Sequence, residues 1–251
     1  MERGLFSTRA SAQAAVLAGK VRVDGVAVSR AAQPVDDAAA IAVDPGPRFV
    51  SRGGDKLDGA LDALGLDVTG ALALDLGAST GGFTDCLLQR GAARVIALDV
   101  GYGQLDWGLR NDERVHVMER VNARDLRPEA LPYRPDLVTC DLAFISVATV
   151  WPAVAACLDP GHQAVVLVKP QFEAGRDAVG RGGVVRDPSA HAGAIRRVAG
   201  ALEAAGSAPA ALVASPLLGP SGNREFFVLS LGPAHERAPF DLEAAIAGVV
   251  G

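Results

Sequence analysis

The segment Asp75-Leu-Gly-Ala-Ser-Thr-Gly-Gly-Phe83 (DLGASTGGF) decides the fold of this 251-residue chain. It follows the apolar run Ala71 to Leu76, and a helix-forming stretch, Thr84 to Arg90, comes directly after it. Glycines at a turn from strand to helix let the backbone approach a ligand closely, and the start of the helix presents free N–H groups. The segment therefore predicts a ligand-binding turn at the edge of an α/β sheet.

Short apolar runs rich in Val, Ile and Leu recur beyond this turn, with helix-like segments between most of them. Continuous rather than alternating apolar runs are typical of strands covered on both faces, so we expect a mostly parallel sheet of seven strands. The runs are Ala71–Leu76, Arg94–Val100, Val115–Met118, Asp136–Cys140, Gln163–Val168, Pro209–Ser215 and Phe226–Leu231, and the helical segments include Thr84–Arg90, Val147–Leu158 and Ala190–Ala205.

The composition, 49% apolar and 21% charged, is that of one main globular domain with room for a small appendage. With 24 basic against 29 acidic residues, the chain is not coated in positive charge, which excludes a histone-like protein but not nucleic-acid binding.

Cys86, Cys140 and Cys157 lie in apolar segments, so we expect them to be reduced core residues of a cytoplasmic protein. No run reaches the roughly 18 to 20 apolar residues of a membrane helix, and no secretory signal is visible.

Residues 1–45 differ from the rest of the chain. Ser7 to Gly19 predicts a helix, and two short strands, Lys20–Val23 and Val26–Val28, flank an Asp24-Gly25 turn. The first 30 residues are locally basic, with Arg3, Arg9, Lys20, Arg22 and Arg30 against Glu2 and Asp24, whereas the whole chain carries a net charge of −5. We therefore expect a small module that docks on a polyanion, followed by a linker over residues 46–54 and the main domain over 55–251.

The glycine turn predicts a nucleoside site without a phosphate. Its spacing is not the G-x-G-x-x-G of dinucleotide folds, and the acid Asp75 two residues before the first glycine suits an amino group. Asp99 ends the next strand, where an acid accepts hydrogen bonds from ribose hydroxyls. S-adenosylmethionine meets these demands, although another nucleotide at the same edge is the alternative. The predicted cofactor residues are Asp75, Gly77, Ser79, Thr80, Gly81, Gly82, Phe83, Asp99, Val100, Asn122, Ala123 and Asp141.

Two lysines and two carboxylates converge on the same sheet edge. Asp141 and Lys169 follow the fourth and fifth strands, Glu225 begins the last strand, and Lys56 opens the helix before the first. Glu225 joins this edge if its strand is antiparallel and inserted beside the fifth. Burial and a second ammonium disfavour the protonated form of Lys169, so this lysine can take the proton of a hydroxyl, which an arginine cannot. Structural salt bridges are the alternative for each residue taken singly.

In six segments that include the glycine turn and the four converging residues, the chain resembles the TlyA-type branch of the FtsJ-like RNA ribose 2′-O-methyltransferases. The matching segments are RFVSRGGDKL (48–57), DLGASTGGFTD (75–85), ALDVGYGQLDW (97–107), CDLAFIS (140–146), LVKPQFEAGR (167–176) and GPSGNREFFV (219–228). The resemblance implies a Rossmann-like methyltransferase sheet whose last-inserted strand is antiparallel. It also implies a Lys-Asp-Lys-Glu catalytic tetrad at Lys56, Asp141, Lys169 and Glu225.

The resemblance further implies that the enzyme uses S-adenosylmethionine to methylate cytidine 2′-hydroxyls in ribosomal RNA, free or in ribosomal subunits. Residues 1–45 are similar to the RNA-binding module named after ribosomal protein S four, and we expect this module to be incomplete at its start. A metal is not required, and we expect a monomer or weak dimer. Another RNA such as tRNA is the alternative substrate, and a non-catalytic ribosome assembly factor is the alternative function. Direct membrane lysis, the haemolysin label of the family, finds no support in the sequence.

A Gly-rich, Arg-bearing segment between Glu173 and Pro188 follows the fifth strand. Its position predicts either a mobile lid that grips RNA phosphates or an ordinary surface loop. The predicted RNA-binding residues are Arg3, Arg9, Lys20, Arg22, Arg52, Arg176, Arg181 and Arg186.

Overall fold

The chain divides into two compact units, Met1–Arg48 and Phe49–Gly251. The structure, a computed structural model, describes residues 3–6, 8–236 and 238–250. The boundary falls inside the segment expected to be a linker, because Phe49 and the helix that begins at Arg52 belong to the second unit. Each unit is described by itself.

The first unit is a helix beside a small antiparallel sheet. Helix α1 spans Arg9–Leu17, and the strands β1 (Val21–Val23), β2 (Val26–Ala27) and β3 (Ile41–Val43) pair in the order β2-β1-β3. Asp24 and Gly25 have left-handed backbone conformations, as a two-residue hairpin turn requires. Strand β3 was not predicted, because its three residues give too short an apolar run; Ser7, the predicted start of the helix, lies outside the described residues.

The second unit is built on a seven-stranded sheet. Its order is β6-β5-β4-β7-β8-β10-β9, with β10 antiparallel to both of its neighbours and the other pairings parallel. The strands are β4 (Leu72–Leu76), β5 (Arg94–Asp99), β6 (Val115–Glu119), β7 (Leu137–Cys140), β8 (Gln163–Val168), β9 (Ala208–Ala214) and β10 (Phe226–Leu231). The predicted seven strands and the antiparallel insertion of the last one are confirmed.

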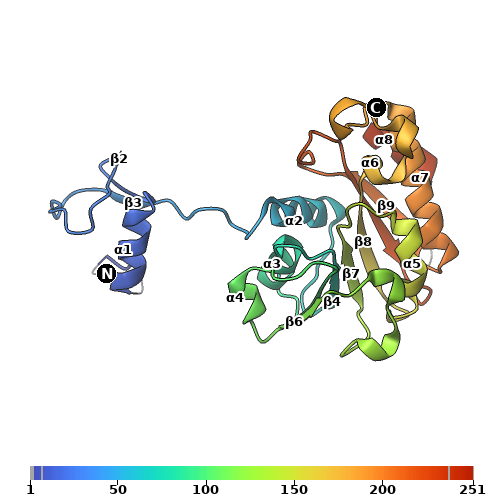
Figure 1. Cartoon of the computed structure of the whole chain (residues 1–251), viewed down its shortest axis with the longest axis horizontal. Coiled ribbons are helices and arrows are strands. Elements are labelled where there is room, and N and C mark those ends of the chain that lie inside the picture. The colour runs from blue at the N-terminus through green and yellow to red at the C-terminus, as the bar shows by residue number, and fades with distance from the viewer. Residues whose placement is uncertain (1–2, 7, 237, 251) are drawn as a thin grey trace. The chain divides into compact units, whose positions relative to one another are not determined.

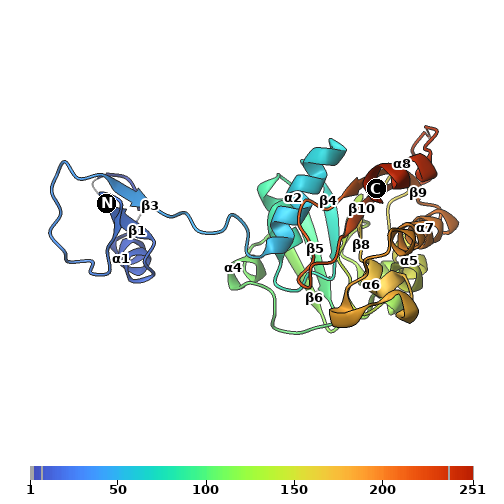
Figure 2. The same cartoon turned by 90° about the horizontal axis from the view of Figure 1, so that it is seen from above.

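Helices cover both faces of this sheet, as Figures 1 and 2 show. One apolar cluster packs β4 and β5 against α2 and α3, and a second packs the opposite sheet face against α5, α7 and α8. The helices are α2 (Arg52–Leu64), α3 (Gly82–Gln89), α4 (Trp107–Arg110), α5 (Val147–Ala155), α6 (Pro170–Glu173), α7 (Pro188–Ala204) and α8 (Leu242–Val250), with short 3-10 turns at Ala123–Asp125, Pro128–Ala130, Arg176–Ala178 and Arg181–Gly183. Cys86, Cys140 and Cys157 are buried, as predicted for core residues.

Candidate active site

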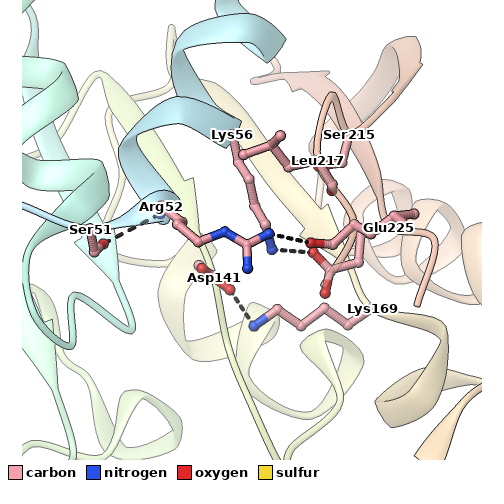
Figure 3. Close-up of polar contacts among 10 residues, drawn as sticks. Ser51, Arg52, Lys56, Asp141, Lys169, Ser215, Leu217 and Glu225 are labelled. Carbon is pink, nitrogen blue, oxygen red and sulfur yellow. Dashed lines mark hydrogen bonds and ion pairs between the residues drawn. The ribbon is translucent and has the colours of Figure 1, made fainter. Parts of the chain in front are cut away.

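The carboxyl edge of the sheet carries a cavity of about 400 Å³ that contains the predicted catalytic lysines. Lys56 reaches it from α2, Asp141 from the end of β7 and Lys169 from the end of β8. These three elements meet there because β7 and β8 are parallel neighbours, so their carboxyl ends lie side by side. The geometry therefore brings together residues that are far apart in the sequence (Figure 3).

The four predicted catalytic residues form two ion pairs. Lys56 Nζ donates to Glu225 Oε2 over 2.6 Å, and both side chains are buried. Lys169 forms the second pair with Asp141, and both of these side chains are partly exposed to the cavity. Two cations and two anions thus balance at the site, with the pair that contains Lys169 more accessible to a substrate than the pair that contains Lys56.

Glu225 is held between the turn before β10 and the Lys56 ammonium. Only 2% of its surface is exposed, and its Oε1 has no hydrogen-bond partner among the described residues. A Cβ on Gly219 would lie 2.4 Å from this oxygen, which is closer than real contacts allow. Gly219 is therefore required for the carboxylate to adopt this position.

A second cavity, of about 430 Å³, adjoins the first and shares Gly77, Ser79 and Asp141 with it. Asp99 lines this second cavity at the end of β5, where its Oδ2 accepts from Ser79 N over 2.8 Å and its Oδ1 from Gly101 N over 2.6 Å. Each carboxylate oxygen keeps a further lone pair for a hydroxyl group. Val100, Asn122 and Ala123 also line this cavity, as predicted for the nucleoside site.

The glycine turn lies between the two cavities. Gly77 has a positive φ of 81°, and a Cβ there would lie 2.4 Å from the Asp141 carbonyl oxygen. Only glycine therefore lets the turn after β4 approach the residue after β7 this closely. Ser79 also has a positive φ, of 49°. Thr80, Gly82 and Phe83 line the first cavity, whereas Gly81 lines neither and packs against Leu109.

Asp75 does not lie where the sequence reasoning placed it. Strand β4 continues through Leu76, so Asp75 points into the interior, with none of its surface exposed, and lines neither cavity. Its carboxylate accepts hydrogen bonds from Thr84 Oγ1 over 2.7 Å and from Thr139 Oγ1 over 3.1 Å. Burial raises the pKa of Asp75 to about 7, although the hydrogen bonds from the two hydroxyl groups act to lower it. Asp75 thus joins β4 to α3 and β7 beneath the turn, and its predicted contact with an amino group is not supported by this placement.

Some residues at the cavities were not predicted. Ser51, the N-cap of α2, and Leu218 line the first cavity, and Gln104, Leu142 and Phe144 line the second. Phe144 is 92% exposed and has a positive φ of 66°, an unusual conformation for an aromatic residue. Phe144 lies in the mostly apolar segment CDLAFIS (140–146), and nothing in that segment predicts that its ring is exposed.

The predicted RNA-binding residues fall into two groups. Arg9, Lys20, Arg181 and Arg186 are exposed, as phosphate contacts require. Three further arginines are also exposed but are engaged with backbone carbonyls: Arg3 donates to Ala39 O over 2.6 Å, Arg22 to Gly25 O over 3.2 Å, and Arg52 to Leu218 O over 3.2 Å. The side chain of Arg176 lies outside the described part of the structure.

The residues at the second cavity fit S-adenosylmethionine. Asp99 would accept from the ribose hydroxyls, Leu142, Ile145 and Val150 supply apolar walls for an adenine ring, and Asp141 at the shared wall is an anion for the cationic end. The described residues contain neither a helix long and apolar enough to cross a membrane nor a group of three or more His, Cys, Asp or Glu placed to hold a metal ion.

The sheet order, the antiparallel β10 and the glycine turn define a methyltransferase of the Rossmann-like class. A candidate S-adenosylmethionine-dependent methyltransferase from Listeria monocytogenes shares this fold, with a TM-score of 0.52 at 14% identity over 72% of this chain and 99% of that one. Residues 49–230 match the FtsJ-like methyltransferases, and the chain belongs to this family.

Similar proteins extend over nearly the whole chain. The 16S/23S rRNA (cytidine-2′-O)-methyltransferase TlyA of Mycobacterium tuberculosis is 52% identical over 230 residues, which cover 91% of this chain and 86% of that protein. The solved structure of a candidate hemolysin from Streptococcus thermophilus has a TM-score of 0.75 and 38% identity, and it covers 98% of this chain and 92% of that one.

Proposed function

We propose that this protein transfers a methyl group from S-adenosylmethionine to the ribose 2′-hydroxyl of cytidine in ribosomal RNA. The observation that carries the proposal is that two ion pairs, Lys56–Glu225 and Lys169–Asp141, lie beside a cavity that fits an adenosine. The identity of 52% to a protein named as such a methyltransferase supports the choice of substrate. The proposed location is the cytoplasm, where ribosomal RNA is found.

S-adenosylmethionine would supply a methyl group on a positively charged sulfur, which departs as a neutral thioether. In the proposal, the side chains of the first cavity hold the ribose so that its 2′-oxygen faces this methyl group. Lys169 first releases a proton to solvent, and its neutral amine then orients the 2′-hydroxyl and takes the hydroxyl proton as the oxygen bonds to the methyl group. Asp141 holds the ammonium that this transfer forms. Lys56, fixed by Glu225, supports the oxygen as it becomes anionic, or the adjacent phosphate. Holding the two reactants in line would account for most of the rate.

The exposed basic side chains are proposed to bind RNA. In the first unit, Arg9 and Lys20 present cations to a polyanion, whereas Arg3 is less suited because its guanidinium already binds carbonyl groups of its own unit. At the mouth of the second cavity, the exposed ring of Phe144 offers a surface on which a base can stack.

The test maps 2′-O-methylated riboses on unmodified ribosomal RNA after incubation with the protein and S-adenosylmethionine. We expect one or more cytidines to become methylated with the wild type and turnover to fall at least a hundredfold with Lys169→Arg, which keeps the charge but does not release its proton. Arg134→Lys is the control, because this exposed residue lines neither cavity, and it keeps its turnover. Full turnover by Lys169→Arg would exclude a role for the lysine as base, and methylation of another RNA in preference would correct the substrate.

A further inference from the structure

A group of basic side chains lines a hollow beside the active site. The hollow has a volume of about 330 Å³, and its lining includes Arg186, His191, Ser221 and Arg224. Among the described residues, those that line it include no Asp or Glu. An anion in this hollow would therefore meet donors and cations. The neighbouring carboxylate, Asp187, caps α7 and accepts from Ser189 N and Ser189 Oγ, each over 2.8 Å.

The hollow and the catalytic cavity lie on either side of one turn. Leu218 and Pro220 line the catalytic cavity, whereas Ser221 and Gly222, the next residues along the chain, line the hollow. A polynucleotide whose ribose enters the catalytic cavity therefore has the hollow within reach of its adjoining backbone. A sugar-phosphate backbone carries one negative charge per nucleotide, so a phosphate is the group that such a chain would bring there.

A buried asparagine fixes the walls of the hollow. Asn223 is 2% exposed; its Nδ2 donates to Gly183 O over 2.9 Å and its Oδ1 accepts from Val185 N over 2.9 Å. These bonds tie the Arg-bearing segment to the turn that leads to Glu225. A site whose walls are fixed before binding loses less entropy when the ligand arrives.

Helix α7 supplies the third wall through His191, which is also buried. Its Nε2 lies 3.0 Å from Val185 O, and since a carbonyl only accepts, Nε2 is the donor. Its Nδ1 has no partner among the described residues. Because this nitrogen is buried, His191 serves to shape the wall and to hold Val185 rather than to contact a ligand.

The two arginines are engaged to different degrees. Arg224 donates to Val249 O over 2.8 Å and to Val250 O over 3.2 Å, which anchors it at the end of α8 while its side chain stays exposed. Arg186 is exposed and makes no hydrogen bond or ion pair with the described residues. Arg186 therefore has its full set of donors for a ligand.

We propose that this hollow is a phosphate subsite that binds the RNA backbone next to the methylated nucleotide, with Arg186 as its main contact. Arg186 and Arg224 donate to the non-bridging oxygens, and the Ser221 hydroxyl adds a third donor. This proposal rests on the proposed function, because it takes RNA to be the substrate. It separates Arg186 from Arg181, which is exposed on the same segment but does not line the hollow.

The test measures how tightly the full-length protein binds unmodified, in-vitro transcribed 16S and 23S rRNA over a series of salt concentrations. The variants are Arg186→Ala, Arg186→Lys and, as a control with the same loss of charge, Arg134→Ala. Arg134 is exposed and precedes β7, at the opposite edge of the sheet. S-adenosylmethionine affinity is measured on each variant to show that the fold is kept.

We expect Arg186→Ala to weaken RNA binding by about tenfold and to lower the slope of log K against log salt by about one. Arg186→Lys should recover part of this loss, because a lysine keeps the charge but not the two-pronged contact. Arg134→Ala should change neither quantity. Equal affinities and slopes for Arg186→Ala and Arg134→Ala would overturn the subsite. Failure of the proposed function is a separate result, in which RNA is bound but no methyl group is transferred. The comparison of RNA affinities would then still show whether the hollow binds the RNA backbone.

Discussion

Lys56 and Glu225 lie 169 positions apart in the sequence and form a buried ion pair with 2.6 Å between Nζ and Oε2. The pair joins α2, which precedes the first strand of the sheet, to the start of β10, its last strand. It therefore links the first helix of the second unit to the last strand of the sheet, and it fixes one of the two lysines that line the first cavity.

Removing one partner of this pair should destabilise the protein. Glu225→Gln or Lys56→Met leaves an uncompensated buried charge, and such changes cost about 3 to 5 kcal/mol. The free energy of unfolding in urea measures the effect. The control is Glu243→Gln, which breaks the exposed Arg196–Glu243 pair and should cost less than about 1 kcal/mol. Equal losses at the two pairs would contradict the structural role given to Lys56 and Glu225.

A methyl group on Gly219 should act on Glu225. The new Cβ in Gly219→Ala would lie 2.4 Å from Glu225 Oε1, so the carboxylate must move away from Lys56. We expect methyl transfer to fall at least tenfold while S-adenosylmethionine affinity is kept. Gly200→Ala is the matched control, since nothing lies within 4 Å of its Cβ inside α7, and it should stabilise the protein by up to about 1 kcal/mol. Unchanged turnover in Gly219→Ala would show that Glu225 is not held as described.

Replacement of Asp99 should weaken cofactor binding. Asp99→Asn replaces one acceptor oxygen by an NH2 group, so the contacts to Ser79 N and Gly101 N and the predicted contacts to ribose hydroxyls are not all kept. We expect affinity for S-adenosylmethionine, measured by calorimetry, to fall by about tenfold or more. Asp67→Asn, at an exposed turn away from both cavities, should leave it unchanged. A wild-type affinity for Asp99→Asn would remove Asp99 from the cofactor site.

The buried Asp75 predicts a pH dependence of stability. Its pKa is raised to about 7 by burial, while an aspartate in an unfolded chain has a pKa of about 3.9. Between these values the folded state holds a proton that the unfolded state has lost, so the free energy of unfolding should decrease as the pH rises towards 7. Asp75→Asn should flatten this part of the curve. Urea unfolding at about pH 5 and about pH 7.5 measures it, and parallel curves for the two proteins would refute the assignment.

Much of the fold was accessible from sequence because its strands are continuous apolar runs. The runs Gln163–Val168 and Phe226–Leu231 coincide with β8 and β10, and the last strand is inserted as expected. Strand β3 was missed because three residues carry too little periodicity to separate them from a loop.

The candidate site was predicted as a set of residues but not as a geometry. Sequence order shows that Asp141 and Lys169 follow strands, yet it does not show which lysine pairs with which carboxylate. Asp75 was misplaced for a related reason: the run Ala71–Leu76 was predicted to its correct end, but the sequence does not show that the Asp75 carboxylate is buried between Thr84 and Thr139. The role of Asn223 depends on contacts with residues about 40 positions away, which no local pattern contains.

The insertion of β10 between β8 and β9 also determines when the proposed site can form during synthesis of the chain. Strand β9 and α7 emerge from the ribosome before Glu225 does, so a nascent chain that ends before this residue lacks both the partner of Lys56 and the strand that pairs with β8. The sheet and the proposed catalytic set are then completed together, when β10 is translated. A protein whose proposed substrate is ribosomal RNA thus lacks part of its proposed site while most of the chain is being synthesised.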